Sequence, residues 1–170
     1  STIASDCAQP ALPTLDKSFV SATQNADASW AVTFSVVATN PSADADLAYS
    51  LADVPGFPSG VTINGRAVTL DGAPLAWDGS SPLVTDRVLP AGESDTFVVV
   101  FTVAVDPGMS SALRACDPAG PGHGFFNAAT LTSGHDRLTD PDCGPVAESV
   151  LPPVPKAVDS GSPPPPRGGA

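Results

Sequence analysis

The stretch from Asp95 to Val105, DTFVVVFTVAV, is the clearest strand in this sequence. Successive side chains of a strand point to opposite sides, so its odd and even positions form two faces. From Phe97 onward the odd-numbered face is apolar, with the side chains of Phe97, Val99, Phe101, Val103 and Val105. The even-numbered face is rich in β-branched residues, which favour strands. Asp106-Pro107-Gly108 then supplies turn chemistry. We therefore predict a half-buried strand that ends at Val105.

The same period of two recurs along the chain. Trp30 to Thr39 alternates in the same way and ends at Asn40-Pro41-Ser42, and a shorter alternating run covers Leu47 to Asp53. The Asn64-Gly65 pair predicts a tight hairpin turn between two short strands. The remaining strands are predicted at 13–20, 61–63, 67–70, 83–89 and 125–132. About seven to nine short strands with turns between them predict an all-β fold, an antiparallel β-sandwich.

The last predicted strand carries an amide on its apolar face. Phe125, Ala129 and Leu131 share one side of the strand, and Asn127 lies on that same side. A buried amide without a hydrogen-bond partner costs about 1–3 kcal/mol. Asn127 is therefore expected to meet a polar partner inside the sandwich, or to react with a neighbour. A polar acidic loop is predicted to follow the strand and to lead to Cys143.

The charge balance excludes several classes of partner. Lys and Arg total 7 against 18 Asp and Glu, which gives a formal net charge of −11. Such an acidic chain is not expected to bind nucleic acid or anionic membranes. The sequence also has no apolar run of the roughly 20 residues that a membrane span requires, so we expect no membrane insertion.

Two groups of acidic residues offer oxygen ligands of the kind that Ca²⁺ prefers. The first is Asp44 with Asp46, and the second is Asp136 with Asp140 and Asp142. Calcium takes six to eight oxygens, and neither group has the spacing of a known calcium loop. A solvated acidic loop is the preferred interpretation, so the sequence predicts no cofactor, with Ca²⁺ as the alternative. Neither a GxSxG motif nor an ordered Ser–His–Asp set occurs, and we do not expect an enzyme.

The two ends of the chain resemble each other. Asp6-Cys7 precedes LPTLDK at Leu12 to Lys17, and Asp142-Cys143 precedes LPPVPK at Leu151 to Lys156. The shared pattern is DC, a short spacer and LPx[LV]xK, and chance similarity in a Pro-rich chain is the alternative. We interpret the pattern as the boundary of a repeating unit in a tandem or head-to-tail array.

That boundary predicts the domain organisation and the cysteine pairing. Residues 1–11 would be an N-terminal linker or the end of a preceding unit, residues 12–150 the sandwich, and residues 151–170 an extended Pro-rich tail, a linker or the start of a following unit. Cys116 and Cys143 would then pair within one unit. Cys7 would be left over, either free or bridged to another chain. Disulfide bonding indicates an oxidising, extracellular compartment.

Five segments of the sequence resemble a known family. They are LDKSF, SWAVTFSVVATNPS, AYSLADVPGFPSGVTI, LPAGESDTFVVVFTVAV and FFNAATLTSG…DPDC. Together they resemble the conserved Ig-like tandem repeat, a domain-of-unknown-function family, of bacterial surface adhesins and pilin-like fibre proteins. The resemblance covers about Leu12 to Cys143. It implies an Ig-like sandwich at the cell surface that builds stalks or filaments.

The resemblance also implies a covalent cross-link. Several sandwich domains of such surface proteins form a Lys–Asn isopeptide bond with the help of a buried acid, and the matching residues here are Lys17, Asn127 and Asp53. The strand pattern agrees, because Lys17 is in phase with Leu15 and Phe19, and Asp53 is in phase with its own apolar neighbours. The alternative is an ordinary Lys17–Asp53 ion pair, with Asn127 hydrogen-bonded to backbone.

Two function classes follow from these observations. The first is an extracellular structural module of a surface fibre, stalk or filament, whose partners are copies of itself or neighbouring Ig-like units. The alternative is an adhesin domain that binds a glycan or protein ligand. An adhesin predicts a concave surface with exposed aromatic side chains such as Tyr49 or Trp77.

Overall fold

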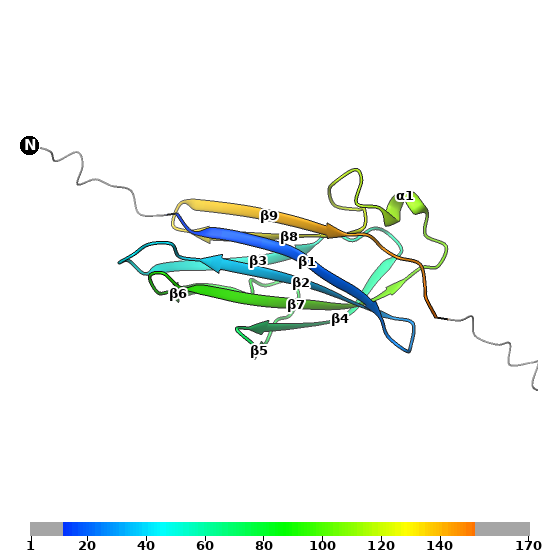
Figure 1. Ribbon diagram of the computed structural model, residues 1–170, viewed down its shortest axis with the longest axis horizontal. Coiled ribbons are helices and arrows are strands. Elements are labelled where there is room, and N and C mark those ends of the chain that lie inside the picture. The colour runs from blue at the N-terminus through cyan, green and yellow to red at the C-terminus, as the bar shows by residue number, and fades with distance from the viewer. Residues whose placement is uncertain (1–11, 152–170) are drawn as a thin grey trace, which may run out of the picture.

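The computed structural model describes residues 12–151 and forms a two-layer antiparallel β-sandwich (Figure 1). One sheet has five strands in the order β1-β2-β7-β4-β5, and the other has four in the order β6-β3-β8-β9. The strands are β1 (Thr14–Gln24), β2 (Trp30–Thr39), β3 (Leu47–Pro55), β4 (Val61–Leu70), β5 (Ala73–Leu75), β6 (Val84–Leu89), β7 (Ser94–Val105), β8 (Phe125–Ser133) and β9 (Asp136–Gly144). One short helix, α1 (Ser111–Arg114), lies between β7 and β8. The fold class predicted from the sequence is confirmed.

The core lies between the two sheets and consists of the alternating side chains that the sequence indicated. Along β2 every second residue from Trp30 to Ala38 is buried, and β7 shows the same alternation from Asp95 to Val103. The two strands are antiparallel neighbours over the whole length of β2, with Phe34 opposite Val99. Burying such side chains is the main favourable term in folding, at about 25 cal/mol per Å² of apolar surface. The β2–β7 pair therefore forms the centre of the five-stranded sheet.

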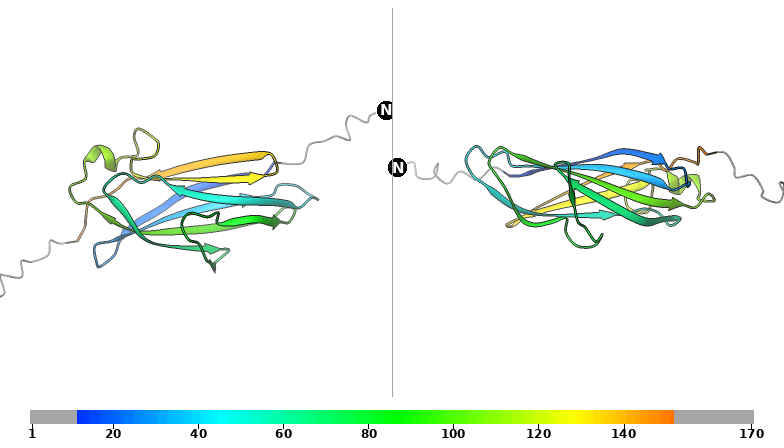
Figure 2. Two further views of the ribbon diagram at one scale, coloured as in Figure 1. Left: turned by 180° about the vertical axis from the view of Figure 1, so that it is seen from behind. Right: turned by 90° about the horizontal axis from the view of Figure 1, so that it is seen from below.

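The described chain enters and leaves the sandwich at opposite ends of its long axis. In Figure 1, β1 begins at the left-hand end and the segment after β9 leaves at the right-hand end. The two further views in Figure 2 show the same separation. Residues 1–11 and 152–170 lie outside the described residues, and so do the expectations for the N-terminal linker, for Cys7 and for most of the Pro-rich tail.

Two local predictions were wrong. Asn64-Gly65 is not a hairpin turn, because β4 continues through it as one strand with a register shift against β7 between Ile63 and Gly65. The long partner β7 pairs on both sides of the shift, so the extra residue is absorbed as a bulge. The acidic loop predicted after β8 is instead strand β9, which pairs with β8 from Phe125 to Ser133.

Candidate functional site

A lysine of β1 points into the core. The side chain of Lys17 follows the inward phase of the strand, and only 4% of the residue is exposed. Its Nζ donates to Oδ1 of Asp53 at 2.6 Å, and both side chains are fully removed from solvent. Because β1 belongs to the five-stranded sheet and β3 to the four-stranded sheet, this ion pair joins the two layers.

Asn127 completes the cluster from β8. It is 0% exposed, and its Nδ2 donates to Oδ2 of Asp53 at 2.9 Å. In the β3–β8 ladder Asp53 lies opposite Ala129, while Asn127 lies opposite Pro55, one inward-facing row along. Diagonal neighbours on one face of a sheet are within reach of each other. Asp53 therefore holds Lys17 with one carboxylate oxygen and Asn127 with the other.

The surroundings of the cluster are aromatic and apolar. The Nζ of Lys17 lies 4.8 Å from the centre of the Phe34 ring. Phe34 in turn makes edge or stacked contacts with Phe19, Phe57 and Phe101. Burial in this environment lowers the pKa of the Lys17 ammonium below 10.5, against the opposing attraction of Asp53. Removing the proton from the Lys17 ammonium therefore costs less free energy here than at the protein surface.

One polar atom of the cluster has no partner. Within the described residues, Oδ1 of Asn127 is buried and makes no hydrogen bond. A buried carbonyl left without a donor costs free energy. Rotating the amide by half a turn would place this oxygen against Asp53, where a donor is present only if Asp53 carries a proton. Transfer of the Lys17 proton to Asp53 would supply that donor.

The structure thus brings together the three residues singled out in the sequence, from strands β1, β3 and β8. It also adds two that sequence reasoning placed in a loop. Asp140 and Asp142 of β9 accept hydrogen bonds from the backbone N–H groups of Lys17 and Phe19, at 2.7 and 2.6 Å. Their spacing of two residues was the available signal, because side chains at positions i and i+2 of a strand share a face.

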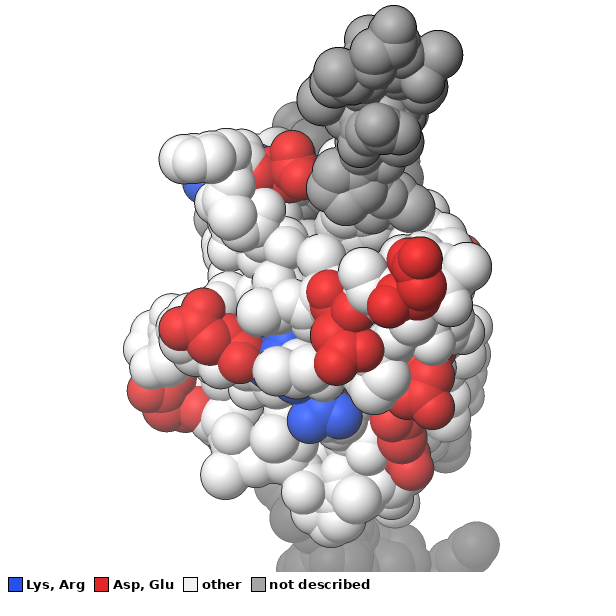
Figure 3. Space-filling model, turned by 90° about the vertical axis from the view of Figure 1, so that its left-hand side faces the viewer, with Lys and Arg blue, Asp and Glu red and all other residues white. Residues whose placement is uncertain are grey.

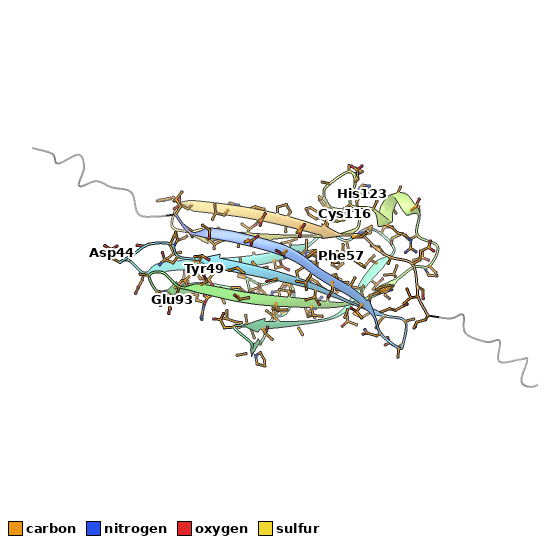
Figure 4. All side chains as sticks on the ribbon, in the orientation of Figure 1. Asp44, Tyr49, Phe57, Glu93, Cys116 and His123 are labelled. Carbon is orange, nitrogen blue, oxygen red and sulfur yellow. A yellow bond between two sulfur atoms is a disulfide. The ribbon has the colours of Figure 1, made fainter. Side chains whose placement is uncertain are left out.

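The predicted cysteine pair is present. Cys116 and Cys143 form a disulfide, with Cα atoms 6.0 Å apart and a sequence separation of 27. It links the end of β9 to the loop that precedes β8. Gly124 permits this packing, because its φ is +59° and a Cβ at that position would lie within 3 Å of both sulfurs. Figure 4 shows Cys116 in the loop region beside α1.

The calcium alternative does not fit the structure. Asp140 and Asp142 are engaged with β1, Asp136 is exposed at the start of β9, and these residues belong to a strand rather than a loop. Asp44 accepts from Ser42, and Asp46 accepts from the backbone N–H of Ala91, at 3.4 Å each. Residues 12–151 contain no group of three or more His, Cys, Asp or Glu residues placed to hold a metal ion.

A second buried polar cluster joins the sheets elsewhere. The hydroxyl of Tyr49 on β3 donates to Asp95 on β7, and Arg87 on β6 donates to both oxygens of the same carboxylate. Tyr49 is only 1% exposed and points into the sandwich (Figure 4). The expectation of Tyr49 as an exposed adhesive aromatic is therefore wrong. Trp77 is half-buried, with its ring edge against Phe101 and its Nε1 donating to the carbonyl of Ser81.

Several exposed carboxylates lie at the end of the molecule where β1 begins (Figure 3). Figure 3 looks onto the end where β1 begins and shows several acidic side chains spread across it. Asp44 and Glu93 are labelled at this end in Figure 4. Across the described range, no helix has the length and apolar character needed to span a membrane.

Comparisons with known proteins give limited information. No protein-family model matches the sequence, and no curated protein matches it. Among solved structures, the chain is similar to the RrgB pilus protein of Streptococcus pneumoniae in its full-length structure, with 13% identity, a TM-score of 0.36, and coverage of 73% of this chain and 23% of that one. A second structure, of the pilus backbone RrgB from the same organism, has 12% identity and a TM-score of 0.36, and the match covers 73% of this chain and 31% of that one. The chain thus spans less than a third of either structure, and values this low establish neither a family nor a function.

Proposed function

We propose that this chain is a structural module of an extracellular fibre or stalk, and that it strengthens itself with an isopeptide bond between Lys17 and Asn127. The observation that carries the proposal is the shared carboxylate of Asp53. It holds the amine of Lys17 and the amide of Asn127 at once, in a site from which water is excluded. A nucleophile, a leaving group and a proton carrier are therefore in place before any reaction.

The reaction needs no cofactor or outside reagent. The Lys17 ammonium first gives a proton to Asp53 and becomes a neutral amine. Nζ then attacks Cγ of Asn127, so that the new Cγ–Nζ bond forms and the Cγ–Nδ2 bond breaks. Asp53 returns its proton to the departing nitrogen and accepts the surplus proton from Nζ. The products are the secondary amide and one molecule of ammonia, and Asp53 acts as general acid and base.

The position of the bond suits a load-bearing role. It would tie β1, close to where the chain enters, to β8 of the opposite sheet, about 110 residues further along. The entry and exit of the described chain lie at opposite ends of the long axis, as in modules linked in series (Figure 1). A structural role at the cell surface also agrees with the disulfide, because disulfides persist in oxidising compartments. The proposed partners are neighbouring copies or further sandwich units, with residues 12–150 as the module and residues 1–11 and 151–170 as its connections.

Intact mass spectrometry of the reduced protein tests the bond. The wild-type chain is expected to be lighter than its sequence by one ammonia, and a proteolytic digest should contain one branched peptide that joins Lys17 to Asn127. Asp53→Ala and Asn127→Ala should keep the full mass. A wild-type chain that keeps its full mass after prolonged incubation rules out the bond.

One side reaction has to be controlled. Asn64-Gly65 is an exposed sequence of the kind that forms a succinimide, and this reaction also releases ammonia. All mass measurements should therefore be repeated in an Asn64→Ala background. Loss of ammonia that persists in Asn64→Ala and disappears in Asn127→Ala assigns the reaction to the buried cluster.

A further inference from the structure

The edge strands of the two sheets are held together by side chains. β1 is outermost in the five-stranded sheet and β9 is outermost in the four-stranded sheet. Figure 1 shows them next to each other and running in the same direction. Since they belong to different sheets, no ladder carbonyl serves the outer N–H groups of β1. The carboxylates of Asp140 and Asp142 accept from Lys17 N and Phe19 N instead, at 2.7 and 2.6 Å.

These two carboxylates lie in the same rows of the sheet as the reacting cluster. Across the four-stranded sheet, Asp53 is opposite Ala129, and Ala129 is opposite Asp140. In the next inward-facing row, Asn127 is opposite Asp142. Asp53 and Asp140 thus lie in one row across the sheet. Asp53 binds the side chain of Lys17, and Asp140 binds its backbone N–H.

The contacts with β9 add to the β1–β2 ladder in setting the register of β1. A slip of two residues keeps the inward phase of the strand but would bring Leu15 or Phe19 to the place of Lys17. Gly144 adds a steric constraint on the same register, because a Cβ at that position would overlap the Phe19 ring. Two hydrogen bonds and one ring contact thus hold consecutive inward-facing residues of β1.

Asp140 and Asp142 do not help the chemistry through their charge. Both favour the charged form of Lys17 and raise its pKa, whereas burial lowers it. A charged ammonium is not a nucleophile, so the electrostatic effect of these carboxylates opposes bond formation. Their contribution to the reaction must therefore come from geometry.

We propose that Asp140 and Asp142 are positioning residues for the Lys17–Asn127 bond, which hold β1 in the one register that places Nζ at Asp53. This inference rests on the proposed function, because it concerns the rate of the same reaction. Small displacements of reacting groups cost large factors in rate. Loss of both contacts is therefore expected to slow formation of the bond by about 10–100-fold.

The rate of ammonia loss separates position from charge. Chains are produced by a short cell-free synthesis, and synthesis is then stopped. Samples are quenched in acid at intervals, and their intact mass is measured by mass spectrometry. In Asp140→Ala/Asp142→Ala both acceptors are lost, and the slow rate is expected. In Asp140→Asn/Asp142→Asn the amide oxygens still accept from β1 while the charges are gone, so the rate should equal or exceed that of wild type. Asp44→Ala/Asp46→Ala removes two carboxylates from an exposed loop as a matched control and should leave the rate unchanged.

The outcomes distinguish this inference from the proposed function. A wild-type chain that never loses ammonia overturns both. A wild-type chain that reacts, with the double Ala variant equally fast, overturns the positioning role alone. A double Asn variant that is slower than wild type by about 10-fold or more also overturns it, because the charges would then be what matters. The Asn comparison stands even if the double Ala variant does not fold, which near-ultraviolet circular dichroism would reveal.

Discussion

Lys17 of β1 and Asp53 of β3 form a 2.6 Å ion pair that crosses the sandwich and has no solvent-exposed side-chain surface. Removing two charges from water costs several kcal/mol per ion, and their mutual attraction often only offsets that cost. A well-packed apolar pair of similar volume would serve the fold as well or better. The polar cluster is therefore explained by chemistry more readily than by stability, and this distinction can be measured.

The first prediction compares single and paired replacements in the unreacted protein. With Asn127→Ala as the reference, adding Asp53→Ala leaves the Lys17 charge buried without its partner. The free energy of unfolding should fall by about 3–5 kcal/mol. Adding Lys17→Met together with Asp53→Leu removes both charges and should recover most of that loss. Urea denaturation measures all three, and a paired replacement as unstable as the single one would contradict the argument.

The pH dependence of stability follows from the lowered pKa of Lys17. In the Asn127→Ala protein, the folded pKa lies below 10.5 because of burial, while the unfolded chain has the ordinary value. Between these two values the unfolded state binds more protons than the folded state, so stability rises with pH across that window. Urea midpoints measured from neutral pH to pH 10 should increase. The slope should be smaller once Lys17→Met is added, and equal slopes would show that Lys17 does not titrate in this window.

The second polar cluster predicts behaviour in acid. Burial alone would raise the pKa of Asp95, but the hydrogen bonds from Arg87 and Tyr49 outweigh it and hold that pKa below 3.8. The stability from this cluster is therefore complete above the unfolded value and is lost as pH falls through the folded value. Tyr49→Phe removes one donor to a charged acceptor and should cost about 1.5–3 kcal/mol near neutral pH. Its effect should shrink in thermal melts taken at pH values stepped downward from 3.8, as Asp95 becomes protonated in the folded protein; an effect that stays undiminished throughout would point to packing rather than the hydrogen bond.

The sequence was sufficient to place the three residues of the buried cluster on inward faces, because the period of a strand is short and strict. Asn127 shares its phase with Phe125 and Leu131, and all three residues are buried in the structure. The phase of Lys17 and Asp53 was read correctly in the same way. What the pattern does not contain is the distance between strands from different sheets. That Lys17 meets Asp53 follows from the stacking of the two layers, which no local pattern specifies.

Strand β9 shows why a local pattern does not predict the contacts of Asp140 and Asp142 with β1. Its sequence, DRLTDPDCG, contains Pro141 and three aspartates, which are depleted in strands. A proline is tolerated here because β9 is an edge strand. The inward-facing aspartates are satisfied by the unpaired amides of β1, which come from the far end of the sequence. A local pattern over residues 136–144 therefore favours a loop, and the strand is made favourable by its pairing with β8 and its long-range contact with β1.

The final prediction concerns mechanical load. If a single molecule is pulled from residues 12 and 151, the proposed Lys17–Asn127 bond would remove the intervening chain from the extensible length. The force then passes from Asn127 back along the chain to Cys116 and through the disulfide to Cys143, because this path is shorter than the one through the β8–β9 hairpin. With the bond and the disulfide intact, full extension should release roughly 85 Å of contour length at about 3.5 Å per residue. Asn127→Ala with the disulfide intact should release roughly 390 Å by the same arithmetic. Force spectroscopy of the two proteins between identical flanking domains measures the difference, and equal lengths would mean that the chain carries load without the cross-link.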